Sequence, residues 1–543
     1  MKKILFFLLI SNHIFAQWSI PNVERDALIS IYNSTNGIGW SQTWDFSKDP
    51  RNWYGIRTRN GNIIEINLRG NALKGDFPAI FSAFSKLQKL DLSSNQLSGE
   101  VSASVSGLAD LVRLDISNNN LSGDPTSFLA SLSQLEELSL GNNQFSAANI
   151  DAFLQNFSNV KVLDLANFGL TAVPQNIPNK PNLEILNLSN NTISQNFNNL
   201  SGLSNLSELN LSGNQLTQIP PEFSSLTNLK VLNLSNNLFA NNYSAPLSAL
   251  VNLEWLSLEN NQISVFPAEL SQLTKLIHLN FGRNKISGGL SSLLVLTNLQ
   301  QLFLNNNLFQ GGFPSELTQF SKLQMLSLAS NNFSGEIPAN TPSLTFIENN
   351  RFNQTQIDNF LQQNLVKADF TYSPQRYDSA EQVLGIIGNS ADLTQSLSGT
   401  DYQFTWLKNL DENTGVHTET YHINNVQNED FATYTCEAYY FKNNPNYRME
   451  VAFFREPITL VEQLGTDDEI LKDLNIYPNP TKDFLNILSK NYKIEEVYIY
   501  DLSGKLMISN NKTQINVRNL PSGAYIISIK TNAGIKNFKF IKY

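Results

Sequence analysis

The chain has 543 residues, a formal net charge of −10 at pH 7, four histidines and a single cysteine, Cys436. One cysteine excludes an intramolecular disulfide, and the acidic balance argues against nucleic acid as a partner, because nucleic-acid binders cluster lysine and arginine. No metal-ligand spacing, nucleophile motif or phosphate-binding loop occurs, so we expect no catalytic residue, no metal and no cofactor.

Residues 1–16 have the composition of a secretory signal peptide. Lys2 and Lys3 precede an apolar run over 4–10, and the stretch ends at Ala16. This run is too short to span a bilayer, and no later stretch has the roughly 20 apolar residues of a membrane helix. We therefore expect an exported chain without a transmembrane segment.

Residues 17–62 are predicted to form an N-terminal cap. A helical segment from Glu24 leads into a loop that contains Trp40, Trp44 and Trp53. A stack of repeats would expose its apolar interior at the first repeat, and large aromatic rings at this place would cover it.

A pattern of apolar residues at positions one, four, six and eleven recurs twelve times between Ile63 and Phe333, at intervals of 23 to 25 residues. Positions four and six point the same way from a short strand, so a repeat can bury them only by stacking on its neighbours. We predict one solenoid over 63–363, including a C-terminal cap, with short parallel strands and an irregular convex side made of turns, extended pieces and 3₁₀ turns.

Position nine of the repeat is asparagine, whose amide can bond backbone groups of its own and neighbouring turns. In the fifth repeat Phe168 stands there instead, and we expect a local irregularity. The predicted structural asparagine ladder is Asn71, Asn95, Asn119, Asn143, Asn191, Asn214, Asn237, Asn261, Asn284, Asn307 and Asn331.

This pattern resembles that of leucine-rich repeats, and segments such as 309–314 and 333–338 resemble the plant-type version. The cap lacks the paired cysteines of plant proteins, which points to a bacterial relative. The resemblance implies an α/β horseshoe in which partners bind the concave face, meaning the side of the sheet that carries positions three and five. About a dozen strands at roughly 4.8 Å spacing would make this face about 55 Å long.

Along the concave face, charged residues give way to large apolar ones. At position five, Asp91, Asp115 and Asp164 are interpreted as a solvated surface ladder, whereas Phe303 is the one aromatic residue there. Exposed aromatic clusters often mark interaction sites, although these rings could instead pack on neighbouring strands or against later segments of the chain. The predicted ligand-binding residues are Trp255, Glu259, His278, Arg283, Phe303 and Met325.

Residues 368–461 lose the repeat and contain short alternating strands. The segment 430–436 has the Asp-x-Ala-x-Tyr-x-Cys pattern of immunoglobulin-like domains, and Trp406 would be the core tryptophan. The second cysteine of that family is missing, and an apolar residue near Leu393 is expected in its place. Cys436 is predicted to be a buried thiol, and His417 and His422 are not expected to form a ligand pair.

An acidic linker over 462–473 precedes a second small β-sandwich over 474–543. In this order and at this place, the terminal motifs resemble the type IX secretion C-terminal sorting domain (type A) of Bacteroidota. That resemblance implies the type IX machinery as a partner, and then either lipopolysaccharide anchoring after removal of the tail or release from a Gram-negative cell. The motif residues are Pro478, Asn479, Pro480, Gly504, Lys505, Gly523 and Tyr525.

The predicted fold is therefore a leucine-rich repeat solenoid followed by two small all-β sandwich domains. The predicted function is non-enzymatic binding or adhesion outside the cell, through recognition of a protein by the concave face. One alternative is capture of extracellular polysaccharide by stacking sugars on the same aromatic residues. A less favoured alternative is a hydrolase hidden in 368–461, which lacks candidate nucleophiles.

Overall fold

The computed structural model describes residues 20–241, 245–342, 344–363, 369–462, 471, 473–532 and 534–543. The chain forms two compact units, Met1–Ser373 and Pro374–Tyr543. The predicted signal peptide over 1–16 and the predicted linker residues 463–470 and 472 lie outside the described residues.

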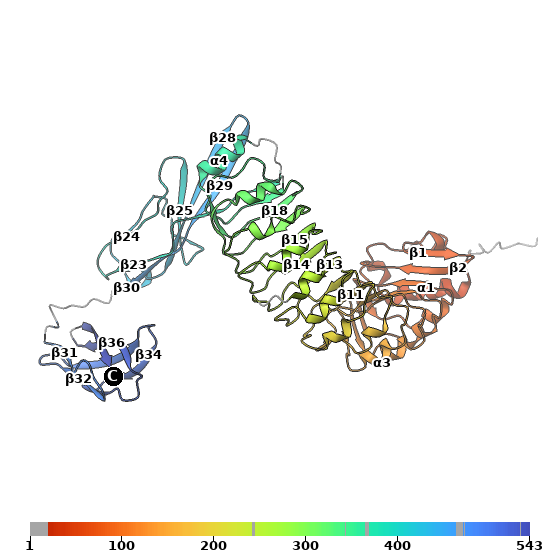
Figure 1. Cartoon of the computed structure of the whole chain (residues 1–543), viewed down its shortest axis with the longest axis horizontal. Coiled ribbons are helices and arrows are strands. Elements are labelled where there is room, and N and C mark those ends of the chain that lie inside the picture. The colour runs from red at the N-terminus through yellow and green to blue at the C-terminus, as the bar shows by residue number, and fades with distance from the viewer. Residues whose placement is uncertain are drawn as a thin grey trace, which may run out of the picture. The chain divides into compact units, whose positions relative to one another are not determined.

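The first unit is built on one 15-stranded sheet in which successive strands are neighbours (Figure 1). β1 (Ile56–Arg59) pairs antiparallel with β2 (Asn62–Asn67), and every later strand joins parallel to the one before it. This confirms the predicted solenoid of short parallel strands. The later strands are β4 (Lys89–Asp91), β6 (Arg113–Asp115), β8 (Glu137–Ser139), β10 (Val162–Asp164), β11 (Ile185–Asn187), β12 (Glu208–Asn210), β13 (Val231–Asn233), β14 (Trp255–Ser257), β15 (His278–Asn280), β16 (Gln301–Phe303), β18 (Met325–Ser327), β20 (Leu344–Phe346) and β21 (Asp369–Thr371).

Repeat positions four and six form the apolar interior. Leu256 and Leu258 in β14 and its following bend are fully buried, as are Leu279 and Phe281 one repeat later. Equal register between neighbouring strands places each leucine over the next, so the buried column is continuous through the unit.

The convex side consists of short pieces. Its strands are β3 (Lys74–Asp76), β5 (Gln96–Glu100), β7 (Asn120–Gly123) and β9 (Gln144–Phe145) in one sheet, and β17 (Gln310–Gly312) with β19 (Asn332–Ser334) in another. Its helical turns are η3 (Phe81–Ala83), η4 (Ala103–Gly107), α2 (Thr126–Leu129), α3 (Ile150–Leu154), η5 (Ile177–Asn179), η6 (Phe197–Leu200), η7 (Pro221–Ser225), η8 (Ala245–Ala249), η9 (Ala268–Gln272), η10 (Ser291–Leu293) and η11 (Ser315–Gln319).

Segments at both ends cover the repeats. At the N-terminal end, α1 (Asn22–Ser34), η1 (Gly37–Gly39) and η2 (Pro50–Asn52) hold Trp40, Trp44 and Trp53, which are all buried. The Glu24 carboxylate accepts a hydrogen bond from the Ile63 backbone N–H at 2.9 Å and so ties α1 to the first repeat. At the other end, α4 (Gln354–Gln363) packs on β21 through a Phe360–Phe370 ring contact.

The second unit contains only strands and one 3₁₀ turn, η12 (Asn428–Asp430), among its described residues. Residues 375–462 form a seven-stranded sheet and a two-stranded pair. The strands are β22 (Gln375–Tyr377), β23 (Glu381–Gly385), β24 (Ala391–Leu393), β25 (Tyr402–Lys408), β26 (Glu412–Asn413), β27 (Tyr421–Ile423), β28 (Thr433–Asn444), β29 (Tyr447–Arg455) and β30 (Ile458–Glu462).

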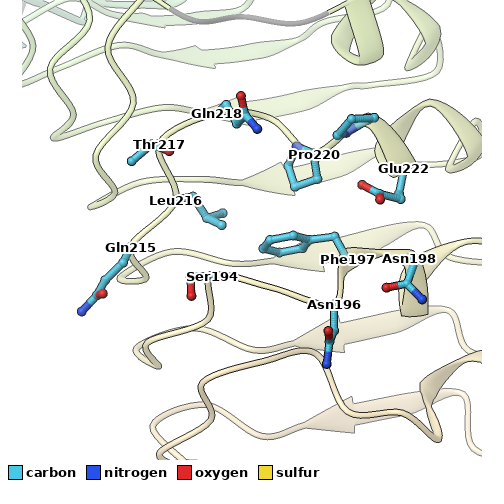
Figure 2. A pocket seen from close by; sticks show the side chains of 11 residues that line it. Ser194, Asn196, Phe197, Asn198, Gln215, Leu216, Thr217, Gln218, Pro220 and Glu222 are labelled. Carbon is cyan, nitrogen blue, oxygen red and sulfur yellow. The ribbon is translucent and has the colours of Figure 1, made fainter.

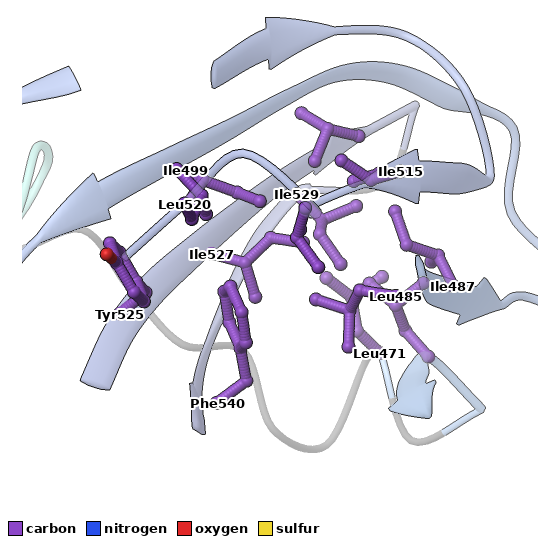
Figure 3. Packing of buried hydrophobic residues seen from close by; sticks show 13 residues of the cluster. Leu471, Leu485, Ile487, Ile499, Ile515, Leu520, Tyr525, Ile527, Ile529 and Phe540 are labelled. Atoms are coloured by element: carbon purple, nitrogen blue, oxygen red, sulfur yellow. The ribbon is translucent and has the colours of Figure 1, made fainter. Parts of the chain in front are cut away.

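The terminal segment is a pair of sheets that pack on a shared apolar core. One sheet holds β31 (Asn475–Tyr477), β32 (Phe484–Leu488) and β35 (Gln514–Asn516), and the other β33 (Ile494–Asp501), β34 (Leu506–Asn510), β36 (Gly523–Thr531) and β37 (Gly534–Lys542). Leu485 and Ile487 of the first sheet meet Ile499, Ile527 and Phe540 of the second in this core (Figure 3).

Candidate binding site

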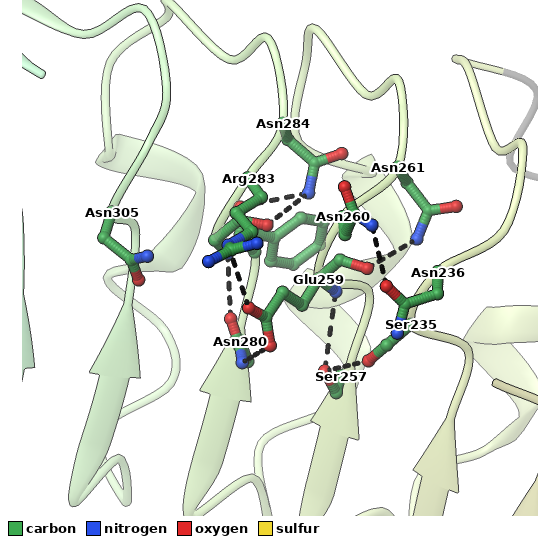
Figure 4. A network of polar contacts seen from close by, with 12 residues as sticks. Ser235, Asn236, Ser257, Glu259, Asn260, Asn261, Asn280, Arg283, Asn284 and Asn305 are labelled. Atoms are coloured by element: carbon green, nitrogen blue, oxygen red, sulfur yellow. Dashed lines mark hydrogen bonds and ion pairs between the residues drawn. The ribbon is translucent and has the colours of Figure 1, made fainter. Parts of the chain in front are cut away.

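The asparagine ladder fixes the bend that follows each strand. The Asn261 side-chain amide donates to the carbonyls of Leu258 and Leu234 at 3.0 and 3.2 Å, and its oxygen accepts from the Phe239 N–H at 3.1 Å. Figure 4 shows Asn261 and Asn284 repeating one another in successive turns. From Asn95 onward, each ladder asparagine thereby bonds its own turn and the turn before it, whereas the Asn71 side chain bonds Gln42 of the cap.

Phe168 replaces this amide in the fifth repeat. Its ring is buried and lies 6.1 Å from the Phe145 ring, while its backbone N–H still donates to the Asn191 oxygen at 2.9 Å. The turn therefore loses the amide of its own repeat and keeps its bond to the next repeat.

Polar residues at position five close the same bend from the concave side. Their side-chain oxygens accept from the backbone N–H two residues later, as in Asn210 to Ser212 at 3.0 Å and Asn280 to Gly282 at 2.8 Å. Phe303 has no oxygen to offer at this position, so its side chain is left for contacts on the face itself.

The interpretation of the position-five aspartates as a solvated surface ladder is wrong for Asp91 and Asp115. Asp91 is 4% exposed and Asp115 is 8% exposed, because the bend folds over their carboxylates. The Arg113 guanidinium lies 3.4 Å from Asp91 and 3.7 Å from Asp115. Burial raises the pKa of Asp115 despite its bond to Ser117, so Arg113 offsets only part of the cost of burying the two carboxylates.

The predicted aromatic residues form a stack across three neighbouring strands. The Trp255 and His278 rings lie 4.8 Å apart with 13° between their planes, and the Phe303 ring lies 5.2 Å from His278. All three are partly exposed, and Met325 occupies the next strand. His278 therefore lies between Trp255 and Phe303, which are not on adjacent strands.

His278 is held as a neutral ring. Burial lowers its pKa, and its Nδ1 lies 2.8 Å from the Gln301 side-chain oxygen, which can only accept. Nδ1 therefore carries the hydrogen. The other nitrogen, Nε2, is a buried atom with no hydrogen-bond partner among the described residues.

A shallow hollow of about 240 Å³ borders the stack. Ile185 and Val231 supply apolar surface, Asn187 and Asn210 supply amides, and Trp255 forms one edge. Trp255 thus belongs to both the stack and the hollow, and the two features make one surface across β11 to β16.

Glu259 and Arg283 form a separate polar pair at the bend. Their charged groups lie 3.7 Å apart, and the Asn280 amide donates to Glu259 at 3.0 Å (Figure 4). The six predicted ligand-binding residues therefore divide into an apolar row and a charged edge. The hollow was not predicted from sequence, although Ile185 and Val231 at position three were a usable signal.

The terminal motif residues hold turns and one strand edge. Asn479, between Pro478 and Pro480, donates to the Lys539 carbonyl and accepts from the Ile541 N–H, both at 2.9 Å. Its amide thereby occupies backbone groups on the outer edge of the last strand. The other motif residues lie in turns or near a strand start. Gly504 lies in a turn and precedes Lys505, whose backbone N–H donates to the Asp501 side chain. Gly523 begins β36, and the Tyr525 hydroxyl donates to the Pro521 carbonyl at 2.9 Å.

In the middle segment the Tyr434 hydroxyl donates to the Asp430 carbonyl at 2.8 Å, as in a tyrosine corner. Burial raises the pKa of the Cys436 thiol to about 11, which leaves it unreactive at neutral pH. The immunoglobulin-like assignment itself stays a prediction. His422 bonds Asp392, while His417 bonds the Phe404 carbonyl.

Across the described ranges, no cluster of three or more histidine, cysteine, aspartate or glutamate side chains could hold a metal ion. None of the helices described has both the length and the apolar composition to cross a bilayer.

Comparison with known proteins identifies two parts of the chain. Leucine-rich repeat family models match residues 61–121, 158–216, 204–263, 298–320 and 322–344, and the secretion system C-terminal sorting domain matches 475–543. The protein is a leucine-rich repeat protein with a type IX sorting domain. That domain marks it for export to the outside or to the cell surface.

A curated relative, ulvan lyase of Nonlabens ulvanivorans, is 36% identical over 74 residues, which is 13% of this chain and 14% of that protein. The chain thus spans only a small part of that relative's length.

Similar solved structures are repeat proteins. A leucine-rich repeat protein of Leptospira interrogans is 28% identical, with a TM-score of 0.45, over 56% of this chain and 83% of that one. An internalin of Listeria monocytogenes is 24% identical, with a TM-score of 0.40, over 51% and 87%. The Arabidopsis receptor kinase HAESA ectodomain, in complex with a peptide hormone, is 23% identical, with a TM-score of 0.47, over 67% and 58%.

Proposed function

We propose that the protein is a non-enzymatic binding protein that recognises another protein on its concave face, outside the cell or at its surface. The observation that carries this proposal is the row of partly exposed rings, Trp255, His278 and Phe303, beside an apolar hollow. Aromatic side chains that keep exposed surface on a rigid sheet gain free energy when a partner covers them.

The distribution of charge along the concave face also favours the row of rings as the binding surface. Arg113 and its carboxylates satisfy one another on the earlier strands, so a partner gains little by replacing these contacts. The row of rings carries no ion pair of its own, and neutral His278 adds no charge to it. A partner with exposed apolar or aromatic side chains fits this surface best.

The test compares two variants of the mature protein by affinity capture and then by titration with the captured partner. Combined Trp255→Ala and Phe303→Ala substitution should weaken binding by about 2 kcal/mol or more, roughly thirtyfold. Lys89→Ala, an exposed residue at position three on β4, is the matched control and should change affinity less than about twofold.

Equal weakening by both variants, or unchanged binding by the double variant with an intact fold, would contradict the proposal. A glycan array is the second arm of the test. Binding to a glycan that is lost in the double variant would favour the polysaccharide alternative on the same surface. Turnover of any substrate by the purified chain would favour the hydrolase alternative.

A further inference from the structure

The convex side contains a hollow between the sixth and seventh repeats that lies apart from the concave face. Its volume is about 330 Å³, at the lower end of the range of about 300–1,000 Å³ for small-molecule sites. In Figure 2 the Phe197 ring lies near the middle of the lining, with Leu216 and Pro220 above it in this view. The ring is partly exposed and contacts the buried Phe223 ring edge-on at 6.4 Å.

The hollow lies beside a break in the convex hydrogen bonding. Between several neighbouring repeats, the position-eleven carbonyl accepts from a backbone N–H of the next turn, as in Thr192 to Leu170 at 2.9 Å and Leu238 to Leu216 at 2.8 Å. Within residues 20–241, no such bond joins Gln215 to Ile193. Next to this break Asn196, with a φ of 64°, directs the chain into η6.

The chemistry of the lining is distinctive. Besides Phe197 it offers four side-chain amides, from Asn196, Asn198, Gln215 and Gln218, and two hydroxyls. Among the eleven lining residues only Glu222 is ionisable, and none is basic. An amide carries two N–H donors and one acceptor, and among the described residues only the Asn198 amide uses a donor within the protein, on Asn199 at 3.3 Å, so the lining can satisfy a ligand that both donates and accepts.

We propose that this hollow binds a neutral carbohydrate. A pyranose ring has one face of C–H groups, which packs on the electron-rich face of an aromatic ring such as Phe197. Its hydroxyls each donate and accept, which matches amides and hydroxyls around the ring. The single carboxylate and the lack of basic groups disfavour acidic or sulfated sugars, because an anion would meet Glu222 without a compensating cation.

A neighbouring hollow could take a second sugar unit. A second hollow of about 210 Å³, lined by residues of the preceding repeats, shares Asn196 with the first. A disaccharide that passes Asn196 would reach both, so disaccharides should bind more tightly than single sugars.

The experiment is saturation-transfer NMR of the mature protein with glucose, galactose, mannose, xylose, cellobiose and maltose, with glucuronic acid as the charged comparison. At least one neutral sugar should show saturation transfer, and glucuronic acid should show less. Phe197→Ala should weaken binding at least about tenfold, while Phe197→Leu, which keeps apolar volume without an aromatic face, should give an intermediate loss.

Two further variants separate this site from the concave face and from misfolding. Gln218→Ala removes an exposed amide and should weaken binding without lowering the melting temperature. Trp255→Ala should leave sugar binding unchanged. Absence of binding by every neutral sugar, equal binding by Phe197→Ala, or equal loss in Trp255→Ala would overturn the proposal, whatever the outcome of the protein-binding test.

Discussion

The earlier and later halves of the concave face share one backbone and differ in what covers their side chains. On β4, β6 and β8, Arg113 pairs with Asp91, Asp115 and Glu137, so the chain satisfies its own charges. On β14 to β16, the rings of Trp255 and its neighbours cover one another only in part. Recognition in a regular array is therefore expected where the internal contacts are incomplete.

The largest effect on stability should come from the asparagine ladder, which both halves share. Asn119→Ala and Asn261→Ala each remove amide bonds to buried carbonyls in two turns and leave those groups without partners. We expect each to lower the free energy of unfolding by about 2–4 kcal/mol. Circular dichroism during heating measures this. If only one of the two substitutions lowered the free energy of unfolding, the two halves would differ in their interior as well as on their surface.

Substitution of Arg113 should lower the free energy of unfolding through contacts of the earlier half alone. Arg113→Ala leaves Asp91 and Asp115 buried beside each other without the cation, and we expect a loss of about 1–3 kcal/mol at pH 7. The loss should shrink as the pH falls through the raised pKa of Asp115, because that carboxyl then takes up a proton. Lys89→Ala is the control, and an equal loss there would exclude the ion-pair explanation.

The repeat spacing sufficed to predict the strands, because burial of positions four and six leaves only one way to stack them. It also placed Trp255 and His278 on neighbouring strands, since both occupy position three. The burial of Asp91 was mispredicted, because the sequence shows which residue faces outward but not that the following bend closes over it.

The convex hollow at Phe197 could not be predicted. It lies where no backbone bond joins Ile193 to Gln215, and single bonds in loops leave no periodic signal. A weak indication exists in the asparagine-rich segment 195–199, which replaces the glycine and proline pattern seen in other repeats.

The later half should show a pH dependence opposite in sign to that of the buried aspartates in the earlier half. Burial holds the pKa of His278 below its usual 6.5, so the unfolded chain takes up a proton at a higher pH than the folded one. The contribution of His278 to stability is therefore fully present above about pH 6.5 and is lost as the pH falls toward the lower pKa of the folded state. His278→Gln should reduce the fall in melting temperature between pH 8 and pH 5, and an unchanged fall would contradict this role.

The smallest change in stability should come from Asp164 on β10, a partly buried carboxylate that has no arginine partner among the described residues. Burial raises its pKa, so the folded chain is most stable below the unfolded pKa and loses stability as the pH rises through the folded value. An asparagine side chain at this position would keep the acceptor that bonds the Ala166 N–H at 2.9 Å, as Asn187 does for Ser189. Asp164→Asn should therefore stabilise the protein by about 1 kcal/mol or less at pH 7 and have no effect near pH 3. Destabilisation at pH 7 would mean that the carboxylate makes a contact that an amide cannot replace, and the earlier half would then hold a second charge-dependent site beside Arg113.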